Sequence, residues 1–151
     1  MKIKKFSAVV IIAAIMILAA APVAGEYNLP PLNGELVVNG EIIEGAPEPF
    51  WLDAENGSVL MIPVRAVAEA LGYDVYWDAA EHGVRLGVAV NLWIGSYEAH
   101  VGRMAPIELS AAPLIKDGRT FVPIDFIRNV LGQYAYVFEG QTVVETETDM
   151  F

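Results

Sequence analysis

The sequence predicts an α+β fold: two pseudo-repeats of antiparallel strands plus one short helix, packed as a single domain. A content of 55% hydrophobic residues is too apolar for a disordered chain, and 13 glycines with 9 prolines are too many for a helical bundle. Segments in which apolar and polar residues alternate are bounded by turn residues, which is typical of strands. In addition, a segment with Pro, Leu and Gly at fixed places occurs twice, at an offset of 60 residues (Pro63 and Pro123).

Residues 1–25 have the composition of a secretion signal peptide. Three lysines among the first five residues precede an almost uninterrupted apolar run from Phe6 to Ala21, and Val23-Ala24-Gly25 provides small residues for cleavage. We therefore expect a secreted or cell-surface protein that begins at Glu26 and has no stable membrane span after cleavage. An uncleaved N-terminal anchor is the alternative, because about 16 apolar residues fall just short of a comfortable span.

The predicted mature chain is acidic and contains no cysteine. Three of the nine Lys and Arg residues lie in the signal, so six remain against 19 Asp and Glu, a formal net charge of −13. Such a charge repels nucleic acid, and the lack of cysteine excludes disulfides, thiol nucleophiles and thiolate metal sites. The expected partner is a cell-wall component, another surface protein or a second copy of this chain.

The ordered part begins after a short linker, residues 26–35, in which two adjacent prolines and an Asn-Gly pair favour an irregular path. The first strands form a hairpin from Leu36 to Ile43, because Asn39-Gly40 is a common tight hairpin turn. The remaining boundaries follow from the repeat and the charge: a domain at residues 36–146 with repeats at about 36–90 and 91–146, and an acidic tail at residues 147–151.

Each repeat contains one short helix whose two ends are marked in the sequence. Proline suits the first helical turn, because its missing N–H has no intrahelical partner there, and glycine suits the exit, where the chain becomes left-handed. These signals place helices from Pro63 to Gly72 and from Pro123 to Gly132. Their apolar faces recur at helical spacing, at Val64, Val67, Ala68 and Leu71 and at Ile124, Ile127 and Leu131.

Two antiparallel strands follow each helix. Period-two alternation runs through residues 73–78 and 84–90 after the first helix, and through 134–138 and 142–144 after the second. A further hairpin, Leu92 to Val101 around Gly95-Ser96, precedes the second helix. The alternation predicts that Trp77 is packed in the core or half-buried. Proline-containing crossing segments that end in a turn, residues 47–57 and 106–118, lead toward the two helices.

Two halves of one motif are divided between the repeats. Residues Asp117 to Pro123 (Asp-Gly-Arg-Thr-Phe-Val-Pro) carry a turn followed by apolar-Pro, whereas residues 63–72 and 75–78 carry Pro-apolar-Arg, a helix ending in Leu-Gly and a strand ending in Trp-Asp. In their order and duplication these motifs resemble the copper amine oxidase N-terminal domain family, over roughly residues 36–145. The resemblance implies a stalk-like domain set apart from a catalytic body, a module that also occurs in exported bacterial surface proteins.

Arg65 and Arg119 are the cationic residues of this motif. The family's arginine is replaced by Asp125 in the second repeat, and Ser58-Val59 replaces Arg-Thr in the first. We expect Arg65 and Arg119 to form a structural clamp, either a buried or semi-buried ion pair or a bond to backbone carbonyls that fixes the turn against the sheet. Ligand binding by the two arginines is the alternative.

The sequence predicts no enzyme activity, no metal and no cofactor. Copper amine oxidation requires three copper-binding histidines and a tyrosine-derived cofactor, and this chain has two histidines, His82 in a turn and His100 near the end of a predicted hairpin. The serines after the signal, among them Ser110, lie outside any Gly-x-Ser-x-Gly elbow. Residues 53–57 alternate oxygen ligands but fail the spacing of a calcium loop, so a solvated turn is expected there.

Trp51, Trp93 and Tyr97 are the candidate binding residues. They lie in or near loops and hairpins, where an exposed ring can stack on a sugar or anchor a partner protein; packing is the alternative. The predicted function is a non-catalytic, exported structural or adhesive surface module that acts in spacing or protein contact. Two other functions stay open: carbohydrate or peptidoglycan binding through these aromatics, and self-assembly in which residues 26–36 add a strand to a neighbour's sheet.

Overall fold

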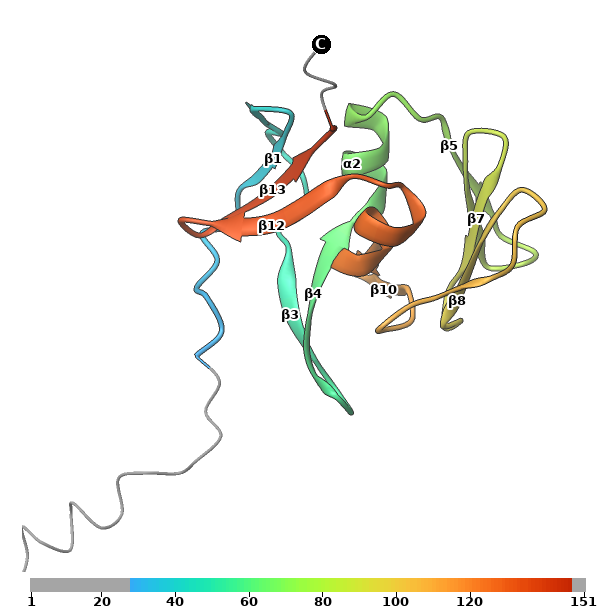
Figure 1. Ribbon diagram of the computed structural model, residues 1–151, viewed down its shortest axis with the longest axis horizontal. Coiled ribbons are helices and arrows are strands. Elements are labelled where there is room, and N and C mark those ends of the chain that lie inside the picture. The colour runs from blue at the N-terminus through green and yellow to red at the C-terminus, as the bar shows by residue number, and fades with distance from the viewer. Residues whose placement is uncertain (1–27, 148–151) are drawn as a thin grey trace, which may run out of the picture.

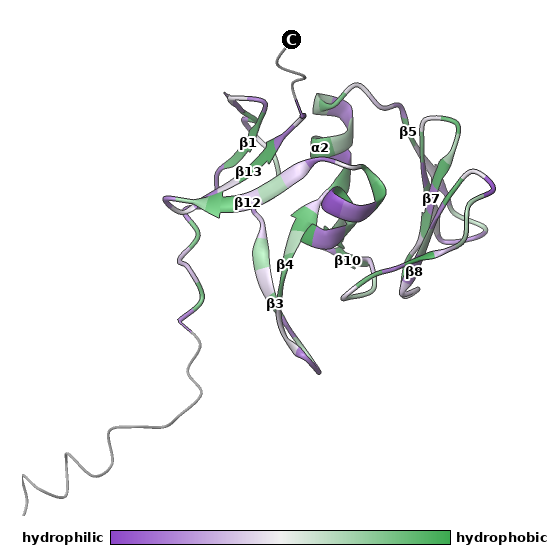
Figure 2. Cartoon of the chain, in the orientation of Figure 1, coloured by the Kyte–Doolittle hydropathy of each residue, from purple (hydrophilic) through white to green (hydrophobic). Residues whose placement is uncertain are grey.

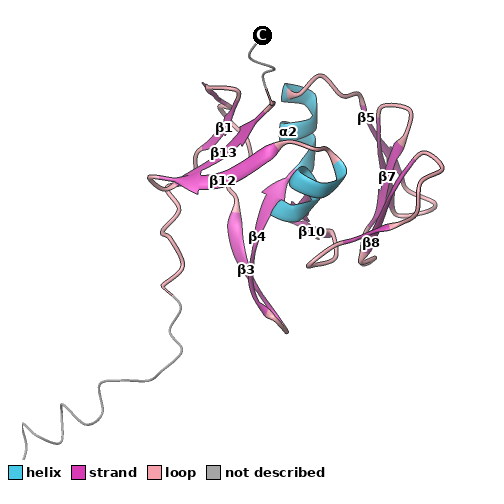
Figure 3. Ribbon diagram, in the orientation of Figure 1, coloured by secondary structure: helices cyan, strands magenta, loops and turns pink. Residues whose placement is uncertain are grey.

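The computed structural model describes residues 28–147, which form three β-sheets and two short helices (Figures 1 and 3). The prediction of an α+β class is confirmed. The predicted signal peptide and all but the first residue of the predicted acidic tail lie outside the described residues. Neither helix of the described part is long and apolar enough to cross a membrane.

A central four-stranded sheet connects the two halves of the chain. In the order β10-β11-β4-β3, its strands are β10 (Leu114–Lys116), β11 (Arg119–Pro123), β4 (Gly57–Pro63) and β3 (Phe50–Ala54). The inner strands β4 and β11 are antiparallel, with Pro63 opposite Phe121, Ile62 opposite Val122 and Met61 opposite Pro123. The two segments that lie 60 residues apart in the sequence are therefore direct neighbours in space.

The segments expected to be irregular crossings contribute the outer strands of this sheet. Asp117 and Gly118 both have positive φ angles, 51° and 74°, as a tight type I′ hairpin turn requires. They join β10 to β11, with Lys116 opposite Arg119. Strand β3 likewise pairs with β4 from Phe50 opposite Met61 to Ala54 opposite Gly57. The sequence did not predict these short edge strands, because prolines lie near them and because so few residues show little alternation.

Each inner strand continues directly into a helix. β4 leads into α2 (Val64–Ala70), and β11 leads into one helical turn and then the π-helix η1 (Phe126–Val130). Pro63 is the last residue of β4 and the N-cap of α2, so the expectation that proline occupies the first helical turn is wrong by one residue. In η1 the wider turn, closed by the Leu131 N–H bonded to the Phe126 carbonyl at 3.2 Å, buries Phe126, which helical spacing of 3.6 did not predict.

The two outer sheets combine hairpins from different parts of the chain. One has the order β5-β6-β7-β8-β9, and the other has the order β12-β13-β1-β2. In the second sheet, β1 pairs with β13 in parallel, so the first and last described strands lie side by side (Figure 1). The strands of the two sheets are β5 (Val75–Asp78), β6 (Gly83–Leu86), β7 (Val90–Trp93), β8 (Glu98–Val101), β9 (Ile107–Glu108), β12 (Tyr134–Phe138), β13 (Gln141–Glu145), β1 (Leu36–Val38) and β2 (Glu41–Ile42).

One large apolar core lies between the three sheets and the two helices. Its fully buried members come from every sheet and from both helices, and include Leu36, Ile62, Val67, Leu92 and Phe126. Figure 2 shows the hydrophilic side of the η1 region turned outward from this core. Trp77 does not belong to it: 41% of this residue is exposed, so the expectation of core packing is wrong. Strand β5 lies at a sheet edge, where both faces remain partly open.

The described part of the predicted linker is attached to the domain. The Asn33 N–H donates to the Gly140 carbonyl at 2.9 Å, and the Glu35 carbonyl accepts from the Thr142 N–H at 3.0 Å. The Trp51 indole Nε1–H donates to the Pro30 carbonyl at 3.0 Å. Residues 30–35 are thus held along the β12–β13 hairpin and near β3 by backbone bonds that a strand exchange with a neighbour would break.

Candidate functional site

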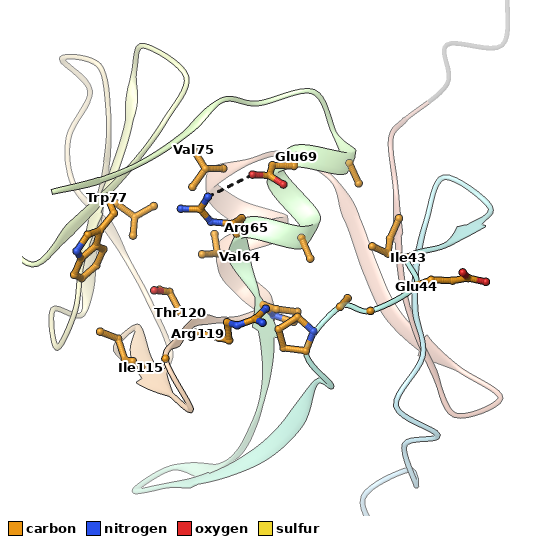
Figure 4. A pocket seen from close by; sticks show the side chains of 18 residues that line it. Ile43, Glu44, Val64, Arg65, Glu69, Val75, Trp77, Ile115, Arg119 and Thr120 are labelled. Carbon is orange, nitrogen blue, oxygen red and sulfur yellow. Dashed lines mark ion pairs between the residues drawn. The ribbon is translucent and has the colours of Figure 1, made fainter. Parts of the chain in front are cut away.

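A surface groove runs along the outer face of α2 (Figure 4). Its volume is about 700 Å³. One wall is the segment after β2, the opposite wall comes from β5 and β6, and the β10–β11 hairpin closes one end. We call it the α2 groove; it is lined by Ile43, Glu44, Gly45, Ala46, Pro47, Pro63, Val64, Arg65, Ala66, Glu69, Ala70, Val75, Trp77, Val84, Ile115, Gly118, Arg119 and Thr120.

The apolar part of the α2 groove consists of side chains that water still reaches. Trp77 is 41% exposed and Ile115 is 48% exposed, although both lie next to the buried residues Val64 and Val84. Figure 4 shows Trp77 and Ile115 on one side, with Val64 and Thr120 across from them. A ligand with apolar side chains would remove these surfaces from water, and full burial of one large aliphatic side chain is worth about 1.5–3 kcal/mol.

Two arginines give the α2 groove a cationic part. Arg65, on α2, has 61% of its side chain exposed and pairs with Glu69 one helical turn later at 3.7 Å. Arg119, at the start of β11, has no ion pair or side-chain hydrogen bond with any residue of the described range. Glu44 supplies a second carboxylate on the far wall. These two arginines are two of the six cationic side chains that follow the predicted signal.

The pairing of β4 with β11 brings both halves of the divided motif into this one groove. Pro63 ends β4 and is followed by Val64 and Arg65, whereas Gly118, Arg119 and Thr120 precede the part of β11 that pairs with β4. Because the strands are antiparallel, the end of β4 lies beside the start of β11. The strand half of the motif completes the site through Val75 and Trp77.

Comparison with known families identifies the domain that carries this groove. The family model described as the copper amine oxidase N-terminal domain matches residues 37–146. The chain belongs to this family. The family is defined on an N-terminal domain and not on the oxidase's catalytic part, which fits a non-catalytic module.

A relative of this family member carries the name "Protease inhibitor" and comes from Brevibacillus choshinensis. It is 31% identical over 145 residues, which cover 89% of this chain and 43% of the relative. The chain therefore spans less than half the length of that protein. No solved structure matches the chain significantly.

In this member of the copper amine oxidase N-terminal domain family, the residue 60 positions after Arg65 is engaged within the fold. Asp125 accepts two hydrogen bonds from Ser110, from its backbone N–H at 2.8 Å and from its hydroxyl at 2.6 Å. Asp125 thus fastens the crossing segment to the second helix. Arg65, the residue at the same position in the first half of the chain, instead lines the α2 groove. The Ser110 hydroxyl thus has a structural partner in the Asp125 carboxylate.

The guanidinium clamp expected at Arg65 and Arg119 is found instead at Arg128. Its Nε and Nη2 both donate to the Ala135 carbonyl, at 2.8 and 2.6 Å, and so connect η1 to β12. Arg65 contacts an acid of its own helix, and both partners are more than half exposed. The sequence carried no signal for Arg128, because a single arginine inside a helix has no characteristic spacing to its carbonyl partner.

None of the three candidate aromatic residues lines the α2 groove. Trp51 is half-buried on β3, where it packs against the core. Trp93 is half-buried on β7 with its ring edge-to-face against His100, the centroids 5.1 Å apart. Tyr97 is 59% exposed in the turn that follows. The sequence analysis passed over Trp77, the one tryptophan in the groove, because alternation suggested a buried position.

The described residues contain no group of three or more His, Asp or Glu side chains that could hold a metal ion. His82 lies against Trp77 with ring centroids 6.5 Å apart, and His100 lies against Trp93. The residues of the rejected calcium loop form the β3–β4 turn, where Asp53 accepts a hydrogen bond from the Ser58 hydroxyl at 3.2 Å.

Proposed function

We propose that this chain is an exported, non-catalytic module that binds an extended segment of a partner protein in the α2 groove. The observation that carries the proposal is the combination of partly exposed apolar walls with Arg119, a cation that has no partner within the described fold. In a chain this acidic, an unpaired guanidinium in the same groove as exposed Trp77 favours a ligand that supplies both a carboxylate and an apolar side chain.

Two sheet edges flank the groove and favour an extended ligand. β5 pairs only with β6, and β10 pairs only with β11, so each presents unpaired backbone groups on its outer side. Val75 and Trp77 on β5 and Ile115 on β10 are also groove residues. A peptide that added to either edge would gain backbone hydrogen bonds and place alternate side chains toward the groove.

The groove also supports the view that the two halves of the chain derive from one unit. The register of β4 against β11 places Ile62 opposite Val122, the residue at the same offset of 60 that relates Pro63 to Pro123. Under this proposal a pseudo-twofold axis passes through that pair, and the groove uses the helix half of one unit and the turn half of the other. Export and exposure at the cell surface rest on the composition of residues 1–25.

A selection of displayed extended peptides on the chain from Glu26 tests the proposal. We expect enriched peptides to contain Asp or Glu next to a large apolar residue and to lose roughly ten- to a hundredfold in affinity to the Arg119→Gln variant. Arg103→Gln is the matched control, because Arg103 is an exposed arginine outside the groove and its loss changes the net charge equally. Failure to enrich any peptide, or equal losses in both variants, would contradict groove binding.

Protease inhibition is a second candidate, favoured by the name of the relative and by one loop. Gly102 to Pro106, between β8 and β9, are five consecutive exposed residues. Both sides of the loop are anchored, since the Gly102 N–H donates to the Ala89 carbonyl at 2.8 Å and β9 pairs with β8. Met104 is 65% exposed, and Pro106 restricts the residue before it to extended conformations. The Met104 N–H also donates to the Val101 carbonyl at 3.0 Å, and a preformed loop can enter a protease cleft with little ordering cost.

Inhibition assays test this candidate. The enzymes are serine endopeptidases whose specificity pockets accept apolar, basic or small side chains. We expect inhibition of an enzyme with an apolar pocket, and a loss of at least about tenfold with Met104→Asp, because a carboxylate would be desolvated in that pocket. Val88→Asp, at a fully exposed position of the neighbouring turn, is the control for the added charge. No inhibition of any class at high protein excess removes the candidate.

A further inference from the structure

We propose that the outer face of the sheet β5-β6-β7-β8-β9 binds a neutral oligosaccharide. This face points away from α2 and η1 (Figure 1). It holds a depression of about 380 Å³, which lies within the usual range of about 300–1,000 Å³ for small-ligand sites. We call it the sheet depression; its polar and aromatic lining consists of Tyr76, Asp78, Glu81, Arg85, Asn91 and Trp93. Only Trp77 and Val84 line both this depression and the α2 groove.

The register of the strands places one row of polar and aromatic side chains across this face. Tyr76 pairs with Arg85 between β5 and β6, and Arg85 pairs with Asn91 between β6 and β7. Residues directly opposite each other in a sheet lie on the same face, and the next residue along each strand lies on the other. That next row contains Val84 and Leu92, which are buried in the core. The row from β5 to β7 therefore faces solvent.

Trp93 lies in a parallel row of the same face and is fixed in place on two sides. It pairs with Gly83, where a Cβ would come within 3.2 Å of the indole Cδ1, so the glycine leaves the room that the ring occupies. The ring also packs edge-to-face against His100, with centroids 5.1 Å apart and an interplanar angle of 82°. A half-buried ring that is already ordered binds a ligand at little cost in conformational entropy. Its Nε1–H has no hydrogen-bond partner among residues 28–147.

The polar side chains of the sheet depression keep free hydrogen-bonding groups. The Arg85 guanidinium lies over the Tyr76 ring at 4.9 Å, which uses its face and leaves the N–H groups in its plane to donate. One oxygen of Asp78 accepts two backbone N–H groups of the following turn, at 3.0 and 3.2 Å, so the other oxygen can accept from a ligand. The Asn91 amide donates to a backbone carbonyl at 3.3 Å, and its oxygen remains as an acceptor.

This combination of groups matches a sugar ring. A pyranose has apolar C–H faces that stack on aromatic rings, and hydroxyl groups at its edge that both donate and accept hydrogen bonds. Tyr76 and Trp93 offer the rings, while donors and acceptors stand beside them in the same depression. A neutral ligand is favoured because two carboxylates, Asp78 and Glu81, outnumber the single guanidinium of Arg85. An anion would meet this excess and the overall charge of the acidic chain, and a cation would meet Arg85.

Titrations of the chain from Glu26 with neutral hexasaccharides test the inference. The probes are cellohexaose, chitohexaose, mannohexaose and xylohexaose, followed by calorimetry and by NMR of the tryptophan indole N–H groups. We expect at least one probe to bind saturably and to shift the indole resonance that Trp93→Phe removes. Hexagalacturonic acid, an anionic hexasaccharide, should bind at least about tenfold more weakly than the best neutral probe. Tighter binding of the acid would contradict a neutral ligand.

Two tyrosines provide a matched pair of variants. Tyr76→Ala removes a ring of the sheet depression and should weaken binding roughly five- to tenfold. Tyr97→Ala is the control, because Tyr97 is 59% exposed against 50% for Tyr76 and lines neither the sheet depression nor the α2 groove. Trp93→Phe keeps an aromatic ring but removes the N–H donor, so it should cost roughly two- to tenfold. Circular dichroism confirms that each variant is folded.

Binding to an insoluble polymer of the preferred sugar distinguishes two sources of the ligand. Retention on the polymer identifies an internal segment of a polysaccharide, whereas binding of the hexasaccharide alone identifies a free oligosaccharide or a chain end; either result supports the site. The inference is overturned if no neutral probe binds at millimolar concentration, or if Tyr76→Ala and Tyr97→Ala weaken binding equally. Peptide selection on the α2 groove is a separate measurement, so the proposed function can hold or fail independently of this result.

Discussion

The argument that Arg65 serves a ligand and Asp125 serves the fold predicts unequal stability losses at two positions 60 residues apart. Asp125→Ala removes two charge-assisted hydrogen bonds to Ser110, at 2.8 and 2.6 Å. Each such bond is worth about 1.5–3 kcal/mol when buried, and both are partly solvated, so we expect a total loss of about 1.5–3 kcal/mol. Arg65→Ala removes an exposed ion pair of 3.7 Å within one helix, worth about 0.3–0.5 kcal/mol.

Thermal unfolding followed by tryptophan fluorescence measures the difference. For a domain of this size, 1 kcal/mol corresponds to roughly 3–6 °C in Tm, so Asp125→Ala should melt about 5–15 °C lower and Arg65→Ala within about 3 °C of the unaltered chain. Ser110→Ala removes one of the two bonds and should fall between them. The reasoning fails if Arg65→Ala is as destabilising as Asp125→Ala, because Arg65 would then be part of the scaffold after all.

Three further predictions follow from the core, the clamp and the tail. Phe126→Ala, at a fully buried position, should lose about 3–5 kcal/mol in urea unfolding, whereas conversion to Leu should lose far less. Arg128→Met, which keeps the apolar stem but leaves the Ala135 carbonyl without its donors, should cost about 1.5–3 kcal/mol by the same measurement. The Glu147 charge raises the pKa of Tyr134 above its usual value of 10.0, so this contact stabilises below pH 10 and is lost as the pH rises through the raised pKa; Tyr134→Phe should flatten stability measured across that range.

Local features of the fold were predictable because their causes are local. Asn39-Gly40 and Gly95-Ser96 do form hairpin turns, and both helices end where Gly72 and Gly132 adopt positive φ angles of 92° and 67°. Such signals act over a few residues, so they can be recognised directly in the sequence. The extra burial of Phe126 was missed because a π turn shifts the helical face, and nothing in a seven-residue segment announces that change of period.

Long-range pairing was not predictable, and the candidate site depends on it. Parallel pairing of β1 with β13 joins segments about a hundred residues apart, and the contact of β4 with β11 spans about sixty. Alternation shows that a segment is a strand but not which strand lies beside it. Arg65 and Arg119 were therefore recognised as parts of one motif without any indication that they line one groove. Trp77 was misplaced for the same reason, because its exposure follows from β5 being an edge strand.

The contrast between positions 65 and 125 argues that the groove is more than a by-product of folding. Both residues follow a strand-ending proline by two positions and lie at the start of a helix. At position 125 a carboxylate fastens the crossing segment through Ser110, which satisfies the polar group inside the fold. At position 65 an arginine stands in solvent, paired only along its own helix, beside a second arginine that has no partner among residues 28–147. The two helix starts therefore differ: Asp125 is engaged across the fold, whereas Arg65 and Arg119 present exposed guanidinium groups that the ligand of the proposed function would engage.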